Sequence, residues 1–284
     1  MEFKKGDKIA LVSCSNGQSK ERKEKYDQLT STIEQIGLVP VWSEYIYQKE
    51  TVFSGTAQER AERLMNFYKD DEIKAIFDIA GGDMANELLP YINFDEIASK
   101  NKLFWGYSDL TVIINAIYTK TNKPSPLYQI CNLVSQDREN QIKNFSNAVF
   151  DHGQDLFQFK YTFIQKNEMR GIVVGGNIRC FLKLAGTEYW PDMTGKILLL
   201  ESWSGSVPQM VSFLNQYQQL KVFEKVSGIL LGTFIQMEND NCLPKITDLV
   251  KRYAGENVPI AVTPEIGHKA TSKAILIGKE LHLH

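Results

Sequence analysis

The stretch "IKAIFDIA" (residues 73–80) is apolar at almost every position, and this pattern decides the fold class. A strand with one solvent-exposed face would alternate apolar and polar residues, whereas a nearly continuous apolar run is typical of a strand buried on both faces. Such strands belong to parallel sheets that carry helices on both sides. We therefore expect this stretch to be a central strand of an α/β sheet.

The sequence around this strand alternates between short apolar stretches and helical patterns. Upstream, the pattern predicts strands and helices in turn, at residues 7–13 (strand), 20–37 (helix), 39–42 (strand) and 56–70 (helix). Downstream, "GGDMANELLPYI" opens a further helix, "KLFWG" is a fourth strand, and another helix begins near Ser108. This order predicts βαβ units and a parallel sheet, whose ligands bind beyond the carboxyl ends of the strands.

The regular alternation weakens between about residues 135 and 170, where the sequence becomes polar. We expect an α/β fold with an N-terminal Rossmann-like parallel-sheet domain over residues 1–150 and a linker over 151–168. A smaller, β-rich α/β domain should occupy residues 169–284, because apolar strands such as "KILLLES" (196–202) follow there with fewer helices between them.

The composition excludes several classes of protein. The chain has 284 residues, of which 43% are hydrophobic and 23% charged, with a net charge of −2, so nothing attracts a nucleic acid polymer. No stretch approaches the roughly 20 apolar residues of a membrane span, and the short apolar run at 9–12 is too short for a signal peptide. The four cysteines are scattered without a C-x-x-C pair, so we expect free thiols, no metal site and a cytoplasmic protein.

The stretch "FWGYSDLTVIINAIY" (104–118) leaves an apolar strand, turns at Gly106 and presents Ser108 where a helix begins. Serine is an ordinary helix cap, which is one reading. The other is that Ser108 is a nucleophile held on a sharp strand-to-helix turn. The stretch lacks the second glycine of the G-x-S-x-G motif.

A nucleophilic serine needs a general base, and the chain has only four histidines. His152 lies in the expected linker and His282 and His284 lie in the final residues, so His268, in a loop flanked by Pro and Gly, is the best-placed base. Glu201 ends the apolar strand 197–200 and is a candidate to orient His268, although it could also serve the start of the next helix.

A tetrahedral intermediate needs backbone N–H donors. The amide of Asp109 lies directly after Ser108, at the start of a helix. A second amide could come from Gly81 and Gly82, which follow the strand 73–80 and permit close approach of the backbone, although a glycine pair is most often only a turn.

Three motifs together resemble those of the LD-carboxypeptidases, serine peptidases that include the microcin C self-immunity proteins. They are "GYSDLT" (106–111), "LLLES" (198–202) and "PEIGH" (264–268), and the stretch 54–95 resembles the microcin-immunity branch. The resemblance implies a Ser108–Glu201–His268 triad, with the amides of Gly82 and Asp109 as the oxyanion hole. It also implies a cofactor-free, typically dimeric enzyme that hydrolyses amides beside a free carboxylate. The substrate would be a cell-wall tetrapeptide or a microcin-type aminoacyl nucleotide, contacted by Gly81 and Asp83.

The sequence departs from the family pattern at two places. Ala80-Gly81-Gly82 stands where the family usually has Arg-Gly-Gly, and an arginine there would suit a substrate carboxylate. The His-Gly-Pro that follows the serine helix in the family is absent from residues 126–137. Two other functions therefore stay open: a non-catalytic binding protein that uses Ser108 only as a helix cap, and a hydrolase of small acyl esters. Trp190 and Trp203 are the aromatic candidates for stacking on a nucleotide, with packing as the alternative role.

Overall fold

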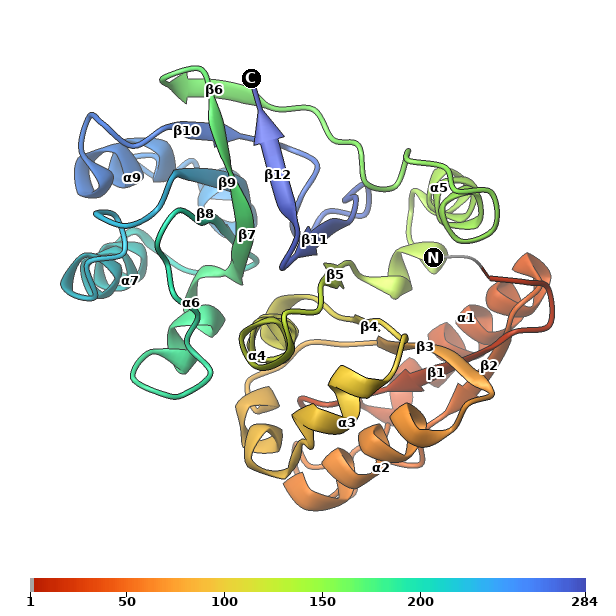
Figure 1. Ribbon diagram of the computed structural model, residues 1–284. Helices are drawn as coiled ribbons and strands as arrows, with labels where there is room; N and C mark the ends of the chain where they lie inside the picture. Colours follow the sequence, from red (N-terminus) through yellow and green to blue (C-terminus); the bar gives the residue numbers. More distant parts are fainter. Residues whose placement is uncertain (1–2) are drawn as a thin grey trace.

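The computed structural model describes residues 3–284, which form two large sheets that lie side by side (Figure 1) and one small sheet. The first half of the chain builds a four-stranded sheet in which every strand runs parallel to its neighbours. The strand order is β2 (Val39–Trp42), β1 (Lys8–Val12), β3 (Ile73–Asp78) and β4 (Phe104–Trp105). The prediction of a parallel sheet from the stretch 73–80 is confirmed.

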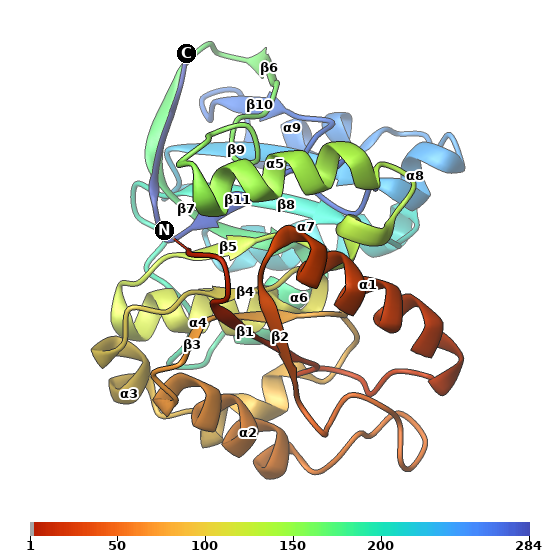
Figure 2. The same ribbon diagram turned by 90° about the vertical axis from the view of Figure 1, so that its right-hand side faces the viewer.

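Helices cover both faces of this sheet (Figure 2). Ile9 and Leu11 of β1 pack with the buried side of α1 (Lys23–Ile36), whereas Ala10 and Val12 pack with α2 (Ala57–Lys69). Because successive side chains of a strand point to opposite faces of the sheet, β1 contributes side chains to the apolar layers on both faces. Since both faces of the central strands are buried, nearly every residue in these strands is apolar.

The helix expected after Gly81-Gly82 is broken into two short pieces. Residues Ala85–Tyr91 form the 3-10 helix η2, and residues Phe94–Ser99 form α3. Pro90 lies inside η2 and has no N–H group to donate, so a continuous α-helix through this segment would lose a hydrogen bond.

The helix α4 (Thr111–Thr121) lies between the two halves of the molecule (Figure 1). Every residue from 111 to 118 is buried, which explains why this helix is apolar on all sides. It contacts α3 in the first half, and β7 (Met169–Asn177) and α6 (Ile178–Phe181) in the second. The turn that precedes α4 is therefore held by both halves.

The second half forms a six-stranded sheet whose middle is parallel and whose two edge strands run antiparallel. Its order is β12 (Glu280–Leu283), β7, β8 (Ile197–Ser202), β9 (Gly228–Phe234), β10 (Ile260–Val262) and β6 (Thr162–Gln165). The remaining helices of this half are η5 (Leu182–Leu184), α7 (Val207–Gln219), α8 (Ile235–Asn239) and α9 (Ile246–Ala254). The expected α/β fold, with a mixed second sheet, is confirmed.

A third, two-stranded sheet joins segments that lie far apart in the sequence. β5 (Ser125–Leu127) pairs antiparallel with β11 (Ile275–Ile277). After β5 the chain forms the 3-10 helix η4 (Ile130–Val134) and α5 (Arg138–Phe150), which pack on the first sheet. None of the helices within residues 3–284 combines the length and apolar character that crossing a membrane requires.

Candidate active site

The turn that presents Ser108 has a strained backbone. After β4 the chain passes Gly106, and Ser108 has a φ of 55°, in the left-handed region that residues other than glycine rarely occupy. Such a conformation costs on the order of 1–3 kcal/mol and is concentrated at functional sites. A Cβ on Gly106 would lie 2.6 Å from the Cβ of Leu110, so only glycine allows the turn to be this tight.

The hydroxyl of Ser108 does not cap the helix that follows. Tyr107 is the N-cap of the short 3-10 helix η3 (Ser108–Leu110), Leu110 is the N-cap of α4, and neither has a side-chain cap hydrogen bond. Instead, Ser108 lines a cavity of about 750 Å³ at the ends of the strands. Ser108 therefore lines the cavity from a strained turn, whereas the helix-cap reading finds no hydrogen bond to support it within residues 3–284.

Gly81 and Gly82 bring the backbone after β3 against this turn. A Cβ on Gly81 would lie 2.7 Å from the Oγ of Ser108 and 3.5 Å from the amide nitrogen of Asp109. A Cβ on Gly82 would lie 2.4 Å from the Oγ of Ser15, in the loop after β1. The glycine pair is therefore needed for close approach and is not simply a turn.

His268 and Glu201 form a hydrogen-bonded pair in the second half of the molecule. The Nδ1 of His268 lies 2.5 Å from the Oε2 of Glu201, and both side chains are buried. Gly267 makes this approach possible, because a Cβ there would lie 2.2 Å from the Oγ1 of Thr233. A carboxylate at Nδ1 favours the tautomer whose proton is on Nδ1, which leaves the lone pair of Nε2 available.

The other ring nitrogen of His268 is buried, and within residues 3–284 it has no hydrogen-bond partner. A Ser–His–Glu triad in its reactive geometry would have a hydrogen bond between this nitrogen and the Ser108 hydroxyl, and this bond is not formed. Both residues nevertheless line the same cavity, and the ring of Tyr107 lies 5.5 Å from the imidazole ring, centroid to centroid. Catalytic hydrogen bonds are often long before substrate binds.

The cavity is lined mainly by polar groups and carries positive charge. Arg22, Lys25 and Arg179 line it together with Ser108, His268, Gly81 and Gly82. Trp203 also lines it and is 57% exposed, with its ring 5.9 Å from that of His268. Trp190 instead stacks on Phe181 at 4.5 Å, so packing explains Trp190 and only Trp203 is open to the cavity.

Asp83 and Asp109 direct their carboxylates elsewhere. Asp83 does not line the cavity, and its Oδ1 pairs at 2.6 Å with Arg179, which does. Asp109 is fully buried, and its carboxylate accepts hydrogen bonds from Ser15, Ala85 and Lys183. The amide nitrogen of Asp109 lies close to the glycine pair, 3.5 Å from where a Cβ on Gly81 would stand.

Sequence reasoning missed several polar residues of this region, among them Ser15, Asp78, Arg179 and Lys183. Asp78 ends β3 and is fully buried, where its carboxylate accepts hydrogen bonds from the amides of Cys14 and Ala80. Burial raises the pKa of Asp78 to about 7. The signal that identified Glu201, an acid at the end of an apolar strand, would have identified Asp78 as well.

The residues near this cavity do not form a metal site. Within residues 3–284 there is no group of three His, Cys, Asp or Glu side chains that could hold a metal ion. The arrangement instead combines a strained serine, glycine-rich backbone and an acid–imidazole pair, which is the set of groups used in acyl transfer.

Comparisons with known proteins agree with this chemistry. Two family models match the chain, the LD-carboxypeptidase N-terminal domain over residues 9–128 and the LD-carboxypeptidase C-terminal domain over residues 170–283. A Treponema pallidum protein with the name of a carboxypeptidase is 26% identical, over 97% of this chain and 89% of its own. The murein tetrapeptide carboxypeptidase of Pseudomonas aeruginosa is 23% identical, over 89% of this chain and 87% of its own.

A further relative is the microcin C7 self-immunity protein MccF of Escherichia coli, 24% identical over 80% of this chain and 75% of its own. A solved structure of MccF in complex with aspartyl sulfamoyl adenosine has the same fold, with a TM-score of 0.89 and 20% identity over 99% of this chain and 94% of that chain. The two family models together cover most of the residues on both sides of the cavity. This chain belongs to the LD-carboxypeptidase family of serine peptidases.

Proposed function

We propose that this protein is a serine carboxypeptidase with Ser108 as nucleophile, His268 as general base and Glu201 as the acid that orients the base. The observation that carries the proposal is the His268–Glu201 pair at 2.5 Å, whose free Nε2 belongs to a residue lining the same cavity as the strained Ser108. A serine that only capped a helix would need neither the imidazole of His268 in the same cavity nor a backbone in the left-handed region.

In the proposed reaction, Ser108 Oγ attacks the carbonyl carbon of the scissile amide, and His268 Nε2 takes the serine proton. Glu201 stabilises the imidazolium that forms. The carbonyl oxygen gains negative charge and accepts hydrogen bonds from the amides of Gly82 and Asp109. When the intermediate collapses, His268 gives its proton to the leaving nitrogen. A water molecule, deprotonated by His268, then releases the acyl group from Ser108.

The substrate in this proposal carries a free carboxylate next to the scissile amide. The cationic side chains of the cavity support this, since Arg179 lies on the cavity wall although position 80 has no arginine. A murein tetrapeptide and an aminoacyl nucleotide both fit the description. The exposed ring of Trp203 supports the nucleotide, because bases stack on aromatic faces. We propose that Gly81 and Asp83 border the bound substrate, Asp83 through its pair with Arg179.

The proposal also includes a cytoplasmic location, which the sequence favours, and a homodimer without a cofactor, which the family resemblance implies. Sedimentation of the purified protein tests the dimer, since one species at the mass of a single chain would contradict it.

The experiment that tests the nucleophile uses a fluorophosphonate, followed by intact mass and peptide mapping. The serine oxygen bonds to phosphorus, fluoride leaves and His268 takes the proton. We expect one adduct, on Ser108. Absence of the adduct together with retained binding of aspartyl sulfamoyl adenosine would favour a binding protein. Hydrolysis of p-nitrophenyl acetate without cleavage of murein tetrapeptide or aspartyl sulfamoyl adenosine would favour an esterase of small acyl groups.

A further inference from the structure

The carboxylate of Asp109 is the meeting point of three segments of the chain, to which Ser15, Ala85 and Lys183 belong. Its Oδ2 accepts from the hydroxyl of Ser15 at 2.7 Å and from the amide of Ala85 at 2.8 Å. Its Oδ1 accepts from the ammonium of Lys183 at 2.5 Å. Asp109 is fully buried and the side chain of Lys183 is only 19% exposed, so this ion pair is largely shielded from water.

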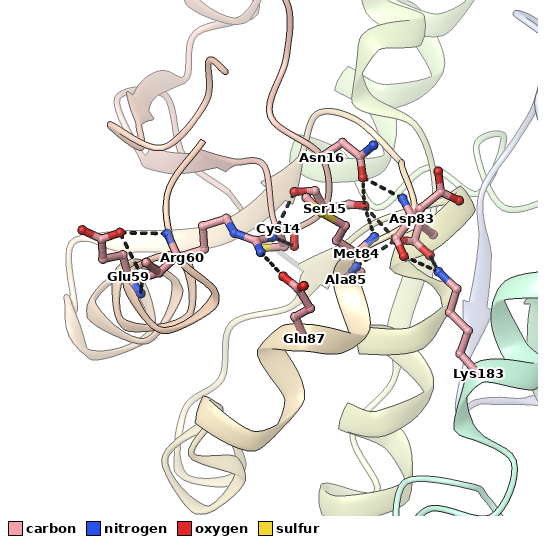
Figure 3. A network of polar contacts seen from close by, with 12 residues as sticks. Cys14, Ser15, Asn16, Glu59, Arg60, Asp83, Met84, Ala85, Glu87 and Lys183 are labelled. Atoms are coloured by element: carbon pink, nitrogen blue, oxygen red, sulfur yellow. Dashed lines mark hydrogen bonds and ion pairs between the residues drawn. The ribbon is translucent and has the colours of Figure 1, made fainter. Parts of the chain in front are cut away.

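Lys183 comes from the other half of the molecule. It lies in η5, after β7, whereas Ser15, Ala85 and Asp109 belong to the first half. The same ammonium also donates to the carbonyl oxygen of Asp83 at 2.7 Å. Lys183 therefore holds two segments at once, the turn after Ser108 and the loop after Gly82. Figure 3 shows Lys183 beside Asp83, which belongs to this loop.

These two segments carry the two amides of the proposed oxyanion hole. The amide of Asp109 belongs to the residue whose carboxylate Lys183 binds, and Gly82 directly precedes the residue whose carbonyl Lys183 binds. The spacing of the two donors sets how well they stabilise the oxyanion, because a donor must lie about 2.7–3.1 Å from that oxygen. One cation thus fixes both sides of the hole.

The positive charge is needed for a physical reason. A buried carboxylate is costly without a cationic partner, and neutral donors compensate it only in part. The first half supplies Asp109 with a hydroxyl and an amide. Arg60 is close by, yet its guanidinium binds the carbonyl oxygens of Cys14 and Ser15 and the carboxylate of Glu87. Lys183 is the cationic partner that Asp109 has within residues 3–284.

We infer that Lys183 is a positioning residue: by binding Asp109 and Asp83 from the second half, it sets the geometry of the oxyanion hole in the first. The inference rests on the proposed function, because it assumes that Ser108 is the nucleophile. It also makes the hole dependent on the docking of the two halves, since η5 must be in place for Lys183 to reach Asp109.

The test measures the rate at which a fluorophosphonate labels Ser108, because the phosphoryl oxygen then occupies the oxyanion hole. We expect Lys183→Met to slow labelling about 10- to 100-fold, less than the loss of a whole oxyanion donor. Lys183→Arg should restore most of the rate. The pH midpoint of labelling should stay where it is in the parent, because the His268–Glu201 pair is untouched.

The matched control is Lys120→Met. Lys120 pairs with Glu188 at 2.5 Å and also joins α4 to the second half, but both side chains of this pair are more exposed. We expect this variant to label at the parent rate. Equal rates for Lys183→Met and Lys120→Met would overturn the inference, as would a Lys183→Arg variant as slow as Lys183→Met.

A second variant guards against loss of folding, because Lys183→Met leaves a buried carboxylate uncompensated. In Lys183→Met/Asp109→Asn no such charge remains, and we expect a thermal midpoint near that of the parent with labelling still slow. Recovery of the parent rate would show that Lys183 only neutralises a charge, which contradicts positioning. A parent protein that is not labelled at Ser108 would instead overturn the proposed function, and the inference with it.

Discussion

The Ser108 turn and the His268 loop face the same cavity but are held in different ways. The turn is fixed by its backbone, through a left-handed serine, glycines that allow close approach and a buried Asp109 behind it. In the His268 loop the backbone is bonded to Thr233, and the imidazole is oriented through its side chain, by a hydrogen bond with Glu201. Changes at the turn should therefore act on geometry, whereas changes at the loop should act on protonation.

The largest expected effect is that of Ser108→Ala, which removes the nucleophile but keeps the turn. We expect the turnover rate to fall by several decades, because no other group can form the acyl intermediate. The thermal midpoint should change little, since the hydroxyl caps no helix. Turnover near the parent rate on murein tetrapeptide or aspartyl sulfamoyl adenosine would show that the backbone strain at Ser108 has no catalytic purpose.

Glu201→Gln tests the other side of the comparison. The amide can still meet the imidazole, but it no longer stabilises the imidazolium, so we expect kcat to fall about 10³- to 10⁴-fold. Glu238→Gln is the matched control, because Glu238 pairs with Lys269, next to His268, on the exposed surface. Similar kcat values for the two variants would remove Glu201 from the proposed triad.

A smaller effect is expected for Arg179→Gln. Arg179 is 45% exposed at the side chain and lines the cavity, so its loss should weaken binding of a substrate carboxylate about tenfold. This weaker binding should appear as a higher KM, with kcat nearly unchanged. The same substrate with its carboxylate amidated serves as the comparison, and an equal rise in KM for both substrates would exclude Arg179 as the carboxylate partner.

The last effect concerns stability and not turnover, and it comes from Asp78, behind the glycine pair. Burial raises its folded-state pKa to about 7, whereas an unfolded aspartate has a pKa of about 3.9. Between these values the folded state keeps the proton that the unfolded state has lost. Asp78 therefore makes the free energy of unfolding fall as pH rises from about 4 to about 7, by at most about 1.4 kcal/mol per pH unit.

Asp78→Asn should remove this dependence of the free energy of unfolding on pH, because an asparagine side chain does not titrate. Urea unfolding at several pH values measures it, with the parent protein as reference. A slope in the variant equal to that of the parent would mean that another group titrates.

The sequence predicted the features that depend on local chemistry. A continuous apolar strand indicated the parallel sheet, and an acid at the end of such a strand identified Glu201 as a residue in need of a partner. Scarcity of histidine singled out His268. The structure brings Ser108 and His268 to one cavity and places Glu201 beside the imidazole.

The features that the sequence did not predict depend on how the halves meet. Lys183 and Arg179 lie in a segment with no pattern that distinguishes them from solvent-exposed basic residues. Their roles arise only because η5 and α6 pack beside the Ser108 turn. The division of the helix after Gly82 was missed for a different reason, since the effect of Pro90 was outweighed by the apolar residues around it.

The pairing of β5 with β11 has a consequence for protein synthesis. A ribosome releases the Ser108 turn and β5 long before it makes the loop of His268 and β11. The side chains of Gln141 and Asn132 also lack their partners until then, because they donate to the carbonyl oxygens of Ala270 and Ser272. A nascent chain thus exposes Ser108 without the imidazole of His268, and the edge of β5 without its partner strand β11. With the proposed triad, hydrolytic activity appears only after the His268 loop has been made, and chaperones have that interval in which to shield β5.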